Sequence, residues 1–154
     1  MRTFIRAILI LFFLSQSSVY AENAATEAEV KAAFIYHFIN YTQWEDSEPN
    51  YYVCIPEDEN LRDVSNNILQ GKVVNGRQIS VVEEAPFCHI LVSSFSPKTE
   101  NTLTIGNLSH GALLEFRVIN NKLRFAADLE KVKNSKLKIS SQLLKMAVLE
   151  SKKL

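Results

Sequence analysis

The stretch YYVCIPEDENLRDVSNNILQGKVVNGRQISVV, residues 51–82, changes its hydrophobic period along its length. Residues 51–55 are a short, β-rich apolar run, and Pro56 ends it. Apolar residues then return at helical spacing, and Gly71 stands where a C-cap glycine belongs. The stretch therefore predicts a strand followed by a helix.

The second part of this stretch predicts a tight hairpin. Asn75-Gly76 is the strongest short turn signal in the chain, and β-branched residues flank it on both sides. We expect the strand after the turn to run through Val82. Early strands that alternate with helices favour a mainly parallel sheet.

Upstream, Thr26 and Glu29 fit a capping box, and residues 27–41 carry apolar and aromatic side chains at helical spacing. We expect a helix there with its aromatic face in the core. The alternative is that aromatic side chains form a platform for a small ligand. Its candidates are Phe34, Tyr41 and Trp44.

Downstream, a nearly continuous apolar run predicts a buried strand over residues 88–93, and residues 102–107 suggest a short further strand. Residues 114–126 alternate around Asn120-Asn121, which predicts an antiparallel hairpin. Short helices are expected after Asp128 and after Ser140 or Ser141. The predicted fold is α/β: a mainly parallel or mixed sheet flanked by helices on both faces, with a late antiparallel hairpin.

The N-terminus has the layout of a secretory signal peptide. Arg2 and Arg6 precede an apolar run, and Ala21 occupies the −1 position of a cleavage site. The run is shorter than the roughly 20 residues that a membrane span needs. We expect cleavage after Ala21, which leaves residues 22–154 as a single exported domain in the periplasm.

Charge and motifs exclude several classes of function. The formal net charge is zero, and loss of Arg2 and Arg6 leaves two more acidic than basic residues. Nothing in this balance suggests a nucleic-acid partner. Glycine-rich nucleotide-binding motifs and the G-x-S-x-G nucleophile elbow are absent from the sequence. We expect no enzymatic activity, no bound metal and no cofactor.

Cys54 and Cys88 are the only cysteines. In an oxidising compartment an even count favours a disulfide. A zinc site that adds His89 is the alternative. A Cys88–His89 catalytic pair is disfavoured, because neighbours on a strand point to opposite faces. A bridge between neighbouring parallel strands needs an offset register, since Cys54 is late in its strand and Cys88 is early in its own.

Four segments, in order, resemble the YfiR-like family of bacterial periplasmic proteins. They are EVKAAFIYHFINYTQW (29–44), GKVVNGRQISV (71–81), CHILVSS (88–94) and LRFAADLEKVKNSKLKISSQLLKMA (123–147). The last is the most specific of the four. Two departures are visible: the chain has no second cysteine pair, and Ala127-Asp128 stands where relatives often carry an aliphatic residue and Asn.

The resemblance implies a regulatory binding protein with an α/β fold, a structural Cys54–Cys88 bridge and a homodimeric state. Such members hold an inner-membrane diguanylate cyclase inactive by binding its periplasmic domain, which lowers cyclic di-GMP signalling and biofilm formation. An outer-membrane lipoprotein can sequester the repressor. Our candidate partner-binding residues are Glu115, Arg117 and Arg124, near the late hairpin. A small-ligand-binding or redox-sensing protein is the alternative function.

Overall fold

The first described helix starts where the capping box predicts. The computed structural model describes residues 24–97 and 99–149, so the expected signal peptide lies outside the described residues. Helix α2 (Glu27–Tyr41) begins after Thr26, whose hydroxyl accepts the Glu29 N–H at 3.2 Å while the Glu29 carboxylate accepts the Thr26 N–H at 2.6 Å. These two bonds satisfy N–H groups that a helix otherwise leaves without partners.

The stretch at residues 50–82 folds as its two periods predict. Strand β2 (Asn50–Cys54) leads into helix α3 (Glu59–Leu69), which Asp58 caps by accepting the Leu61 N–H at 2.9 Å. A hairpin of β3 (Val73–Val74) and β4 (Arg77–Val82) follows. Asn75 and Gly76 both have positive φ, at 50° and 79°, as a two-residue hairpin turn requires.

The second half of the chain adds short strands and short helices. Strands β5 (Ile90–Val92) and β6 (Leu103–Ile105) precede the 3₁₀ turn η1 (Leu108–His110). The late hairpin pairs β7 (Leu114–Ile119) with β8 (Lys122–Ala127), and Asn120 and Asn121 form its turn with φ of 51° and 59°. The remaining elements are α4 (Leu129–Asn134), β9 (Lys138–Ile139), α5 (Ser141–Met146) and β10 (Val148–Leu149).

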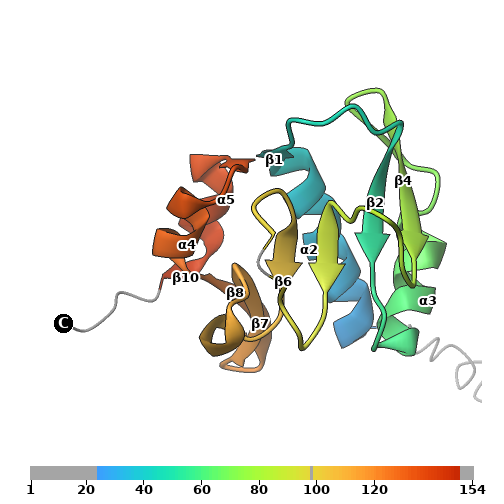
Figure 1. Ribbon diagram of the computed structural model, residues 1–154. Helices are drawn as coiled ribbons and strands as arrows, with labels where there is room; N and C mark the ends of the chain where they lie inside the picture. The colour runs from blue at the N-terminus through green and yellow to red at the C-terminus, as the bar shows by residue number, and fades with distance from the viewer. Residues whose placement is uncertain (1–23, 98, 150–154) are drawn as a thin grey trace, which may run out of the picture.

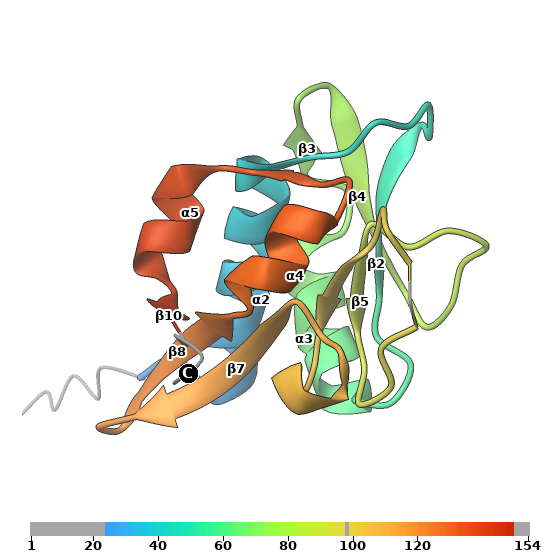
Figure 2. The same ribbon diagram turned by 60° about the vertical axis from the view of Figure 1, so that its left-hand side comes forward.

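The predicted α/β class with a mixed, mainly parallel sheet is confirmed. The eight-stranded sheet has the order β10-β8-β7-β6-β5-β2-β4-β3, and within it only the β3–β4 and β7–β8 pairs are antiparallel. Helices α2 and α3 lie side by side behind the strands in Figure 1, while α4 and α5 lie near β8 and β10. Figure 2 shows that the β7–β8 hairpin projects beyond the rest of the sheet.

The structure departs from the sequence expectations where elements are shortest. Strand β5 covers only Ile90–Val92 of the expected 88–93, because the chain reaches it through a loop that includes Cys88 and His89. Strand β1 (Thr42–Gln43) pairs with β9 in a separate antiparallel sheet, and β10 adds a parallel edge to β8. These two-residue strands are too short to leave a periodic signal.

Aromatic and aliphatic side chains from α2 and the sheet fill the core. Phe38 and Phe125 are fully buried, and their ring centroids lie 5.0 Å apart in an edge-to-face arrangement. Such pairs add stability beyond the apolar area that they bury. No helix in the described part of the chain has the length and apolar character needed to cross a membrane.

Candidate functional site

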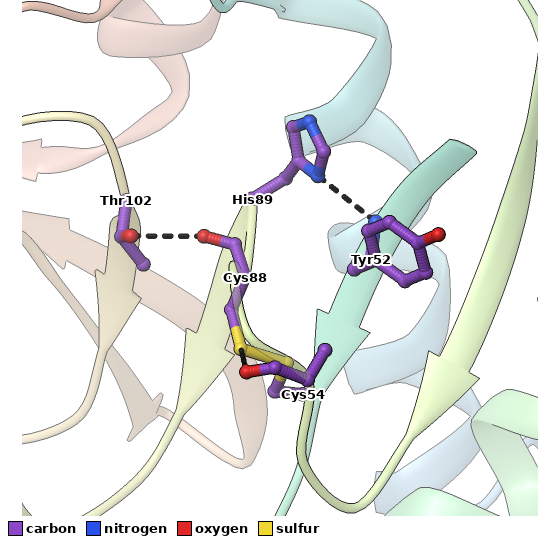
Figure 3. Close-up of a disulfide and its surroundings, with 6 residues drawn as sticks. Tyr52, Cys54, Cys88, His89 and Thr102 are labelled. Carbon is purple, nitrogen blue, oxygen red and sulfur yellow. Dashed lines mark hydrogen bonds between the residues drawn. A yellow bond between two sulfur atoms is a disulfide. The ribbon is translucent and has the colours of Figure 1, made fainter. Parts of the chain in front are cut away.

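A disulfide joins Cys54, the last residue of β2, to Cys88 in the loop between β4 and β5, with 5.9 Å between the two Cα atoms. The bridge that the sequence predicts is thus present in the structure, and it leaves neither sulfur as a thiolate ligand for zinc. On its β2 side, strand β5 pairs with the end of β2 through Val53↔Ile90 and Cys54↔Leu91, so the register is offset as the bridge requires. Figure 3 shows the bridge and the Thr102 hydroxyl that donates to the Cys88 carbonyl at 2.8 Å.

His89, the residue after Cys88, is fully buried. Its Nδ1 accepts the Tyr52 N–H at 2.9 Å, as Figure 3 shows, and Trp44, Tyr51 and Phe87 pack edge-to-face against its ring. An imidazole whose Nδ1 accepts must carry its proton on Nε2 when neutral. His89 is therefore held in one tautomer.

Asp46 and Arg77, which are both partly buried, complete the cluster around His89. Arg77 Nη2 donates to Asp46 Oδ1 at 2.8 Å and to the Asn50 carbonyl at 3.0 Å, which uses both of its hydrogens. The Nε2–H of His89 faces Asp46 Oδ2 at 3.2 Å, and the same nitrogen lies 2.8 Å from Arg77 Nη2. The Arg77 guanidinium also lies 4.1 Å from the centre of the Tyr51 ring. The cluster joins the loop before β2 to β4 and to the start of β5.

Burial sets the charges of this cluster. It lowers the pKa of His89 to about 4, and Asp46 opposes this shift while Arg77 adds to it. For Asp46, burial acts to raise the pKa, but hydrogen bonds from the Glu48 N–H and Arg77 outweigh it and lower the pKa. A neutral imidazole and an ionised carboxylate thus face each other at neutral pH. Because both ring nitrogens are engaged away from solvent, the cluster is a structural node.

A second feature is a cleft of about 420 Å³ at the carboxyl ends of β2, β5 and β6. Strand β2 lies between β4 and β5, so the strands that follow β2 in the chain are added first on one side of it and then on the other. The place where the strand order reverses in this way is the topological switch point, and open α/β sheets bind ligands there. Ser93-Ser94, which the sequence places at a strand end, lies here. The lining residues are Glu57, Asp58, Val92, Ser93, Ser94, Ile105, Gly106, Asn107, Glu115 and Phe116.

The polar lining of the cleft is internally bonded. Glu57 accepts the Ser93 hydroxyl at 2.6 Å and the Ser94 N–H at 3.1 Å, and these hydrogen bonds lower the pKa of Glu57. Ser93 therefore donates to a carboxylate, and none of the residues that line the cleft is a histidine that could act as its base. The cleft thus combines negatively charged side chains with apolar lining residues such as Phe116.

The late hairpin brings together the three candidate partner-binding residues. Arg117 pairs directly with Arg124 across the hairpin, and Glu115 lies on the same face two residues before Arg117. Glu115 accepts the Arg117 Nε–H at 2.9 Å and the Leu108 N–H at 2.8 Å. Burial acts to raise the pKa of Glu115, but these hydrogen bonds, above all that from Leu108, keep it lowered.

The three aromatic candidates for a ligand platform belong to separate groups of rings. Phe34 packs against Phe38 and Phe125 in the core. Trp44 packs against Tyr51 and His89, and Tyr41 stacks beside His37 with 36% of its surface exposed. They do not converge on one pocket.

Sequence reasoning did not find the Asp46–Arg77–His89 cluster or the role of Glu57. Asp46 and His89 are 43 residues apart, and no motif or spacing links them. Glu57 stands beside Asp58 in a polar connection, which is typical of a solvated surface. Its position two residues after the strand at 51–55 is the one available signal, because strand ends meet at one edge of a parallel sheet.

Comparison with known proteins adds one finding. A family model described as YfiR/HmsC-like matches residues 28–148. No curated protein matches the chain significantly.

Proposed function

Because this chain belongs to the YfiR/HmsC-like family, we propose that it is a periplasmic, non-enzymatic regulator of diguanylate cyclase signalling. In the finer form of the proposal, it binds the periplasmic domain of an inner-membrane diguanylate cyclase and holds that enzyme inactive. The family match over residues 28–148 carries the proposal. The candidate contact surface is the β7–β8 hairpin with Glu115, Arg117 and Arg124.

Such repression requires no chemistry at the binding surface. A protein that prefers one state of its receptor shifts the receptor equilibrium by its difference in affinity for the two states. Moving a receptor from 1:99 to 99:1 takes a preference of about 10⁴-fold. A rigid surface suits this task, since little binding energy is lost in ordering it. A homodimer and a sequestering outer-membrane lipoprotein are further parts of the proposal.

Deleting the gene in its native host tests this function. We expect cyclic di-GMP and biofilm to rise, and the full chain supplied in trans to restore the lower level. A matched control lacks residues 1–21, stays in the cytosol and does not restore repression. Unchanged cyclic di-GMP after deletion contradicts the proposal.

A small-ligand-binding role is the second candidate, and the cleft at the carboxyl ends of β2, β5 and β6 favours it. With Glu57 and Glu115 beside Phe116, this cleft suits a small molecule with a positive charge and an apolar body. A thermal-shift screen of metabolites tests it. Stabilisation by amines that Glu57→Gln removes supports this role, and the absence of any stabilised hit counts against it.

A further inference from the structure

The outer half of the β7–β8 hairpin has no strand on either side among the described residues. Strand β6 pairs with β7 only at Leu114, and β10 pairs with β8 only at Ala126 and Ala127. The rest of the hairpin projects beyond the sheet, as Figure 2 shows. Among residues 24–97 and 99–149, no neighbouring strand pairs with these edges, so their backbone N–H and C=O groups can pair with an added strand.

One face of this projecting part is basic. Arg117 lies directly opposite Arg124, and Lys122 pairs with Ile119 on the same face. Glu115 on the same face pairs with Arg117 at 2.9 Å, so the basic charge offered to a partner comes from Arg124 and Lys122. Arg124 and Lys122 are exposed, and the described part of the chain contains no ion-pair partner for either. Negative charge on a bound partner would therefore stabilise this face of the hairpin.

The other face of the projecting part is apolar. Val118 is 62% exposed and pairs with Leu123, and both lie on the face that continues the core side of the hairpin. An added strand would thus meet basic side chains on one face and apolar side chains on the other. Because successive residues of a strand alternate between faces, its complement is a segment that alternates acidic and apolar residues.

We propose that the free edge of β8, at Lys122–Arg124, takes up such an extended acidic segment of a partner protein as an added strand. A second copy of this hairpin would bring the same basic face against itself, so charge argues against that occupant. The edge of β7 is disfavoured because Glu57, Asp58 and Glu115 gather in the cleft beside it. This inference rests on the proposed function, since it names the kind of partner surface that the regulator binds.

A peptide probe tests the surface without knowledge of the partner. The probe is a fluorescent eight-residue peptide of alternating glutamate and valine, measured by anisotropy with the full exported chain. We expect saturable binding that the double variant Lys122→Glu/Arg124→Glu weakens about tenfold or more. Lys72→Glu, at the opposite edge of the sheet, is the matched control and leaves binding unchanged.

Two further probes separate strand addition from simple charge attraction. A lysine–valine peptide should bind at least about tenfold more weakly. A glutamate–valine peptide N-methylated on alternate residues keeps its charge but loses the backbone donors of one edge, and it should also lose binding. Equal binding of the N-methylated peptide, or of the double variant, overturns the inference.

The double variant should remain folded, because Arg124→Glu replaces a like-charge pair with an opposite-charge pair across the hairpin. Thermal unfolding checks this. A binding assay with the periplasmic cyclase domain then distinguishes the two proposals. If wild type and double variant bind that domain equally, the surface is wrong and the function stands; if wild type fails to bind it while the acidic peptide binds, the function is wrong.

Discussion

His89 is neutral because its surroundings leave no place for a second proton. A proton on Nδ1 would face the Tyr52 N–H that now donates to it, and it would put a charge in a fully buried site. The protonated form must therefore break the contact between the start of β5 and β2. Protonation of His89 in acid is therefore coupled to loss of structure.

Stability should fall on mild acidification through His89. Its pKa is about 4 in the folded chain and about 6.5 when unfolded, so the unfolded chain binds more protons between these values. The contribution is complete above about pH 6.5 and is lost as the pH falls towards 4. We expect a loss of about 2 kcal/mol between pH 7 and pH 5 in urea unfolding.

The carboxylates provide the contrast for this prediction. Asp46, Glu57 and Glu115 have lowered pKa values, so their contributions are lost only below the usual carboxyl range. The fall between pH 7 and pH 5 should therefore disappear in His89→Gln. An NMR titration in which His89 gains its proton near pH 6.5 in the folded protein would contradict the assignment.

Gly106 is required by close backbone approach rather than by a special φ. A Cβ at this position would meet the Ser93 carbonyl oxygen, a backbone atom that cannot move aside without disturbing β5. We expect Gly106→Ala to lower the free energy of unfolding by about 1 to 3 kcal/mol. Ser94→Ala, at the neighbouring strand end, should cost less, and equal effects in urea unfolding would refute this explanation.

At the scale of elements, the connection from β4 to β5 is unusually short for parallel strands. Such crossovers normally need a dozen or more residues, often with a helix, whereas residues 83–89 suffice here. The offset register explains this, because Val82 and Leu91 are both level with Cys54 and the chain has little distance to travel along the sheet. The disulfide then fixes this loop to the strand that it passes.

Removing the disulfide should destabilise the fold without changing its topology. The bridge closes a loop with a sequence separation of 34, which corresponds to about 3 to 4 kcal/mol in the chain-entropy model. We expect the double variant Cys54→Ala/Cys88→Ala to lose this amount in urea unfolding. Reductant should destabilise the wild type but leave the double variant unaffected, and two reactive thiols in the native protein would contradict the bridge.

At the scale of the whole molecule, opposite charges gather in different places. The cleft at the carboxyl ends of the strands is acidic, whereas the projecting hairpin is basic on one face. These surfaces lie on either side of Glu115, whose carboxylate bonds to Arg117 and also lines the cleft. Two surfaces of opposite charge can bind two partners that differ in the sign of their charge.

We also predict that the whole chain is exported and that its signal peptide is removed. Cleavage after Ala21 should give a periplasmic protein that begins at Glu22, which intact mass spectrometry of the purified protein measures. Ala21→Leu removes the small residue at −1 and should block processing. A protein that retains residues 1–21 and remains in the membrane would contradict cleavage.

Local signals in the amino-acid sequence are sufficient to predict the class of this fold and most of its elements. Capping residues, turn residues and hydrophobic period are local signals, so Thr26, Asn75-Gly76 and Asn120-Asn121 predicted the ends and turns that the structure has. The disulfide also followed from composition and compartment. The resemblance to the YfiR-like family, carried by ordered segments, agrees with the family match.

The roles of the charged and titratable residues depend on contacts that exist only in the folded chain. Asp46, Arg77 and His89 meet because the order of strands places distant segments together, and burial then sets the pKa of His89. Likewise, it is the strand pairing that shows β10 beside Ala126 and Ala127 and, within the described residues, no strand beside Lys122 and Arg124. Contacts between distant segments and the burial that follows from them have no local period, so the order of residues alone does not reveal them.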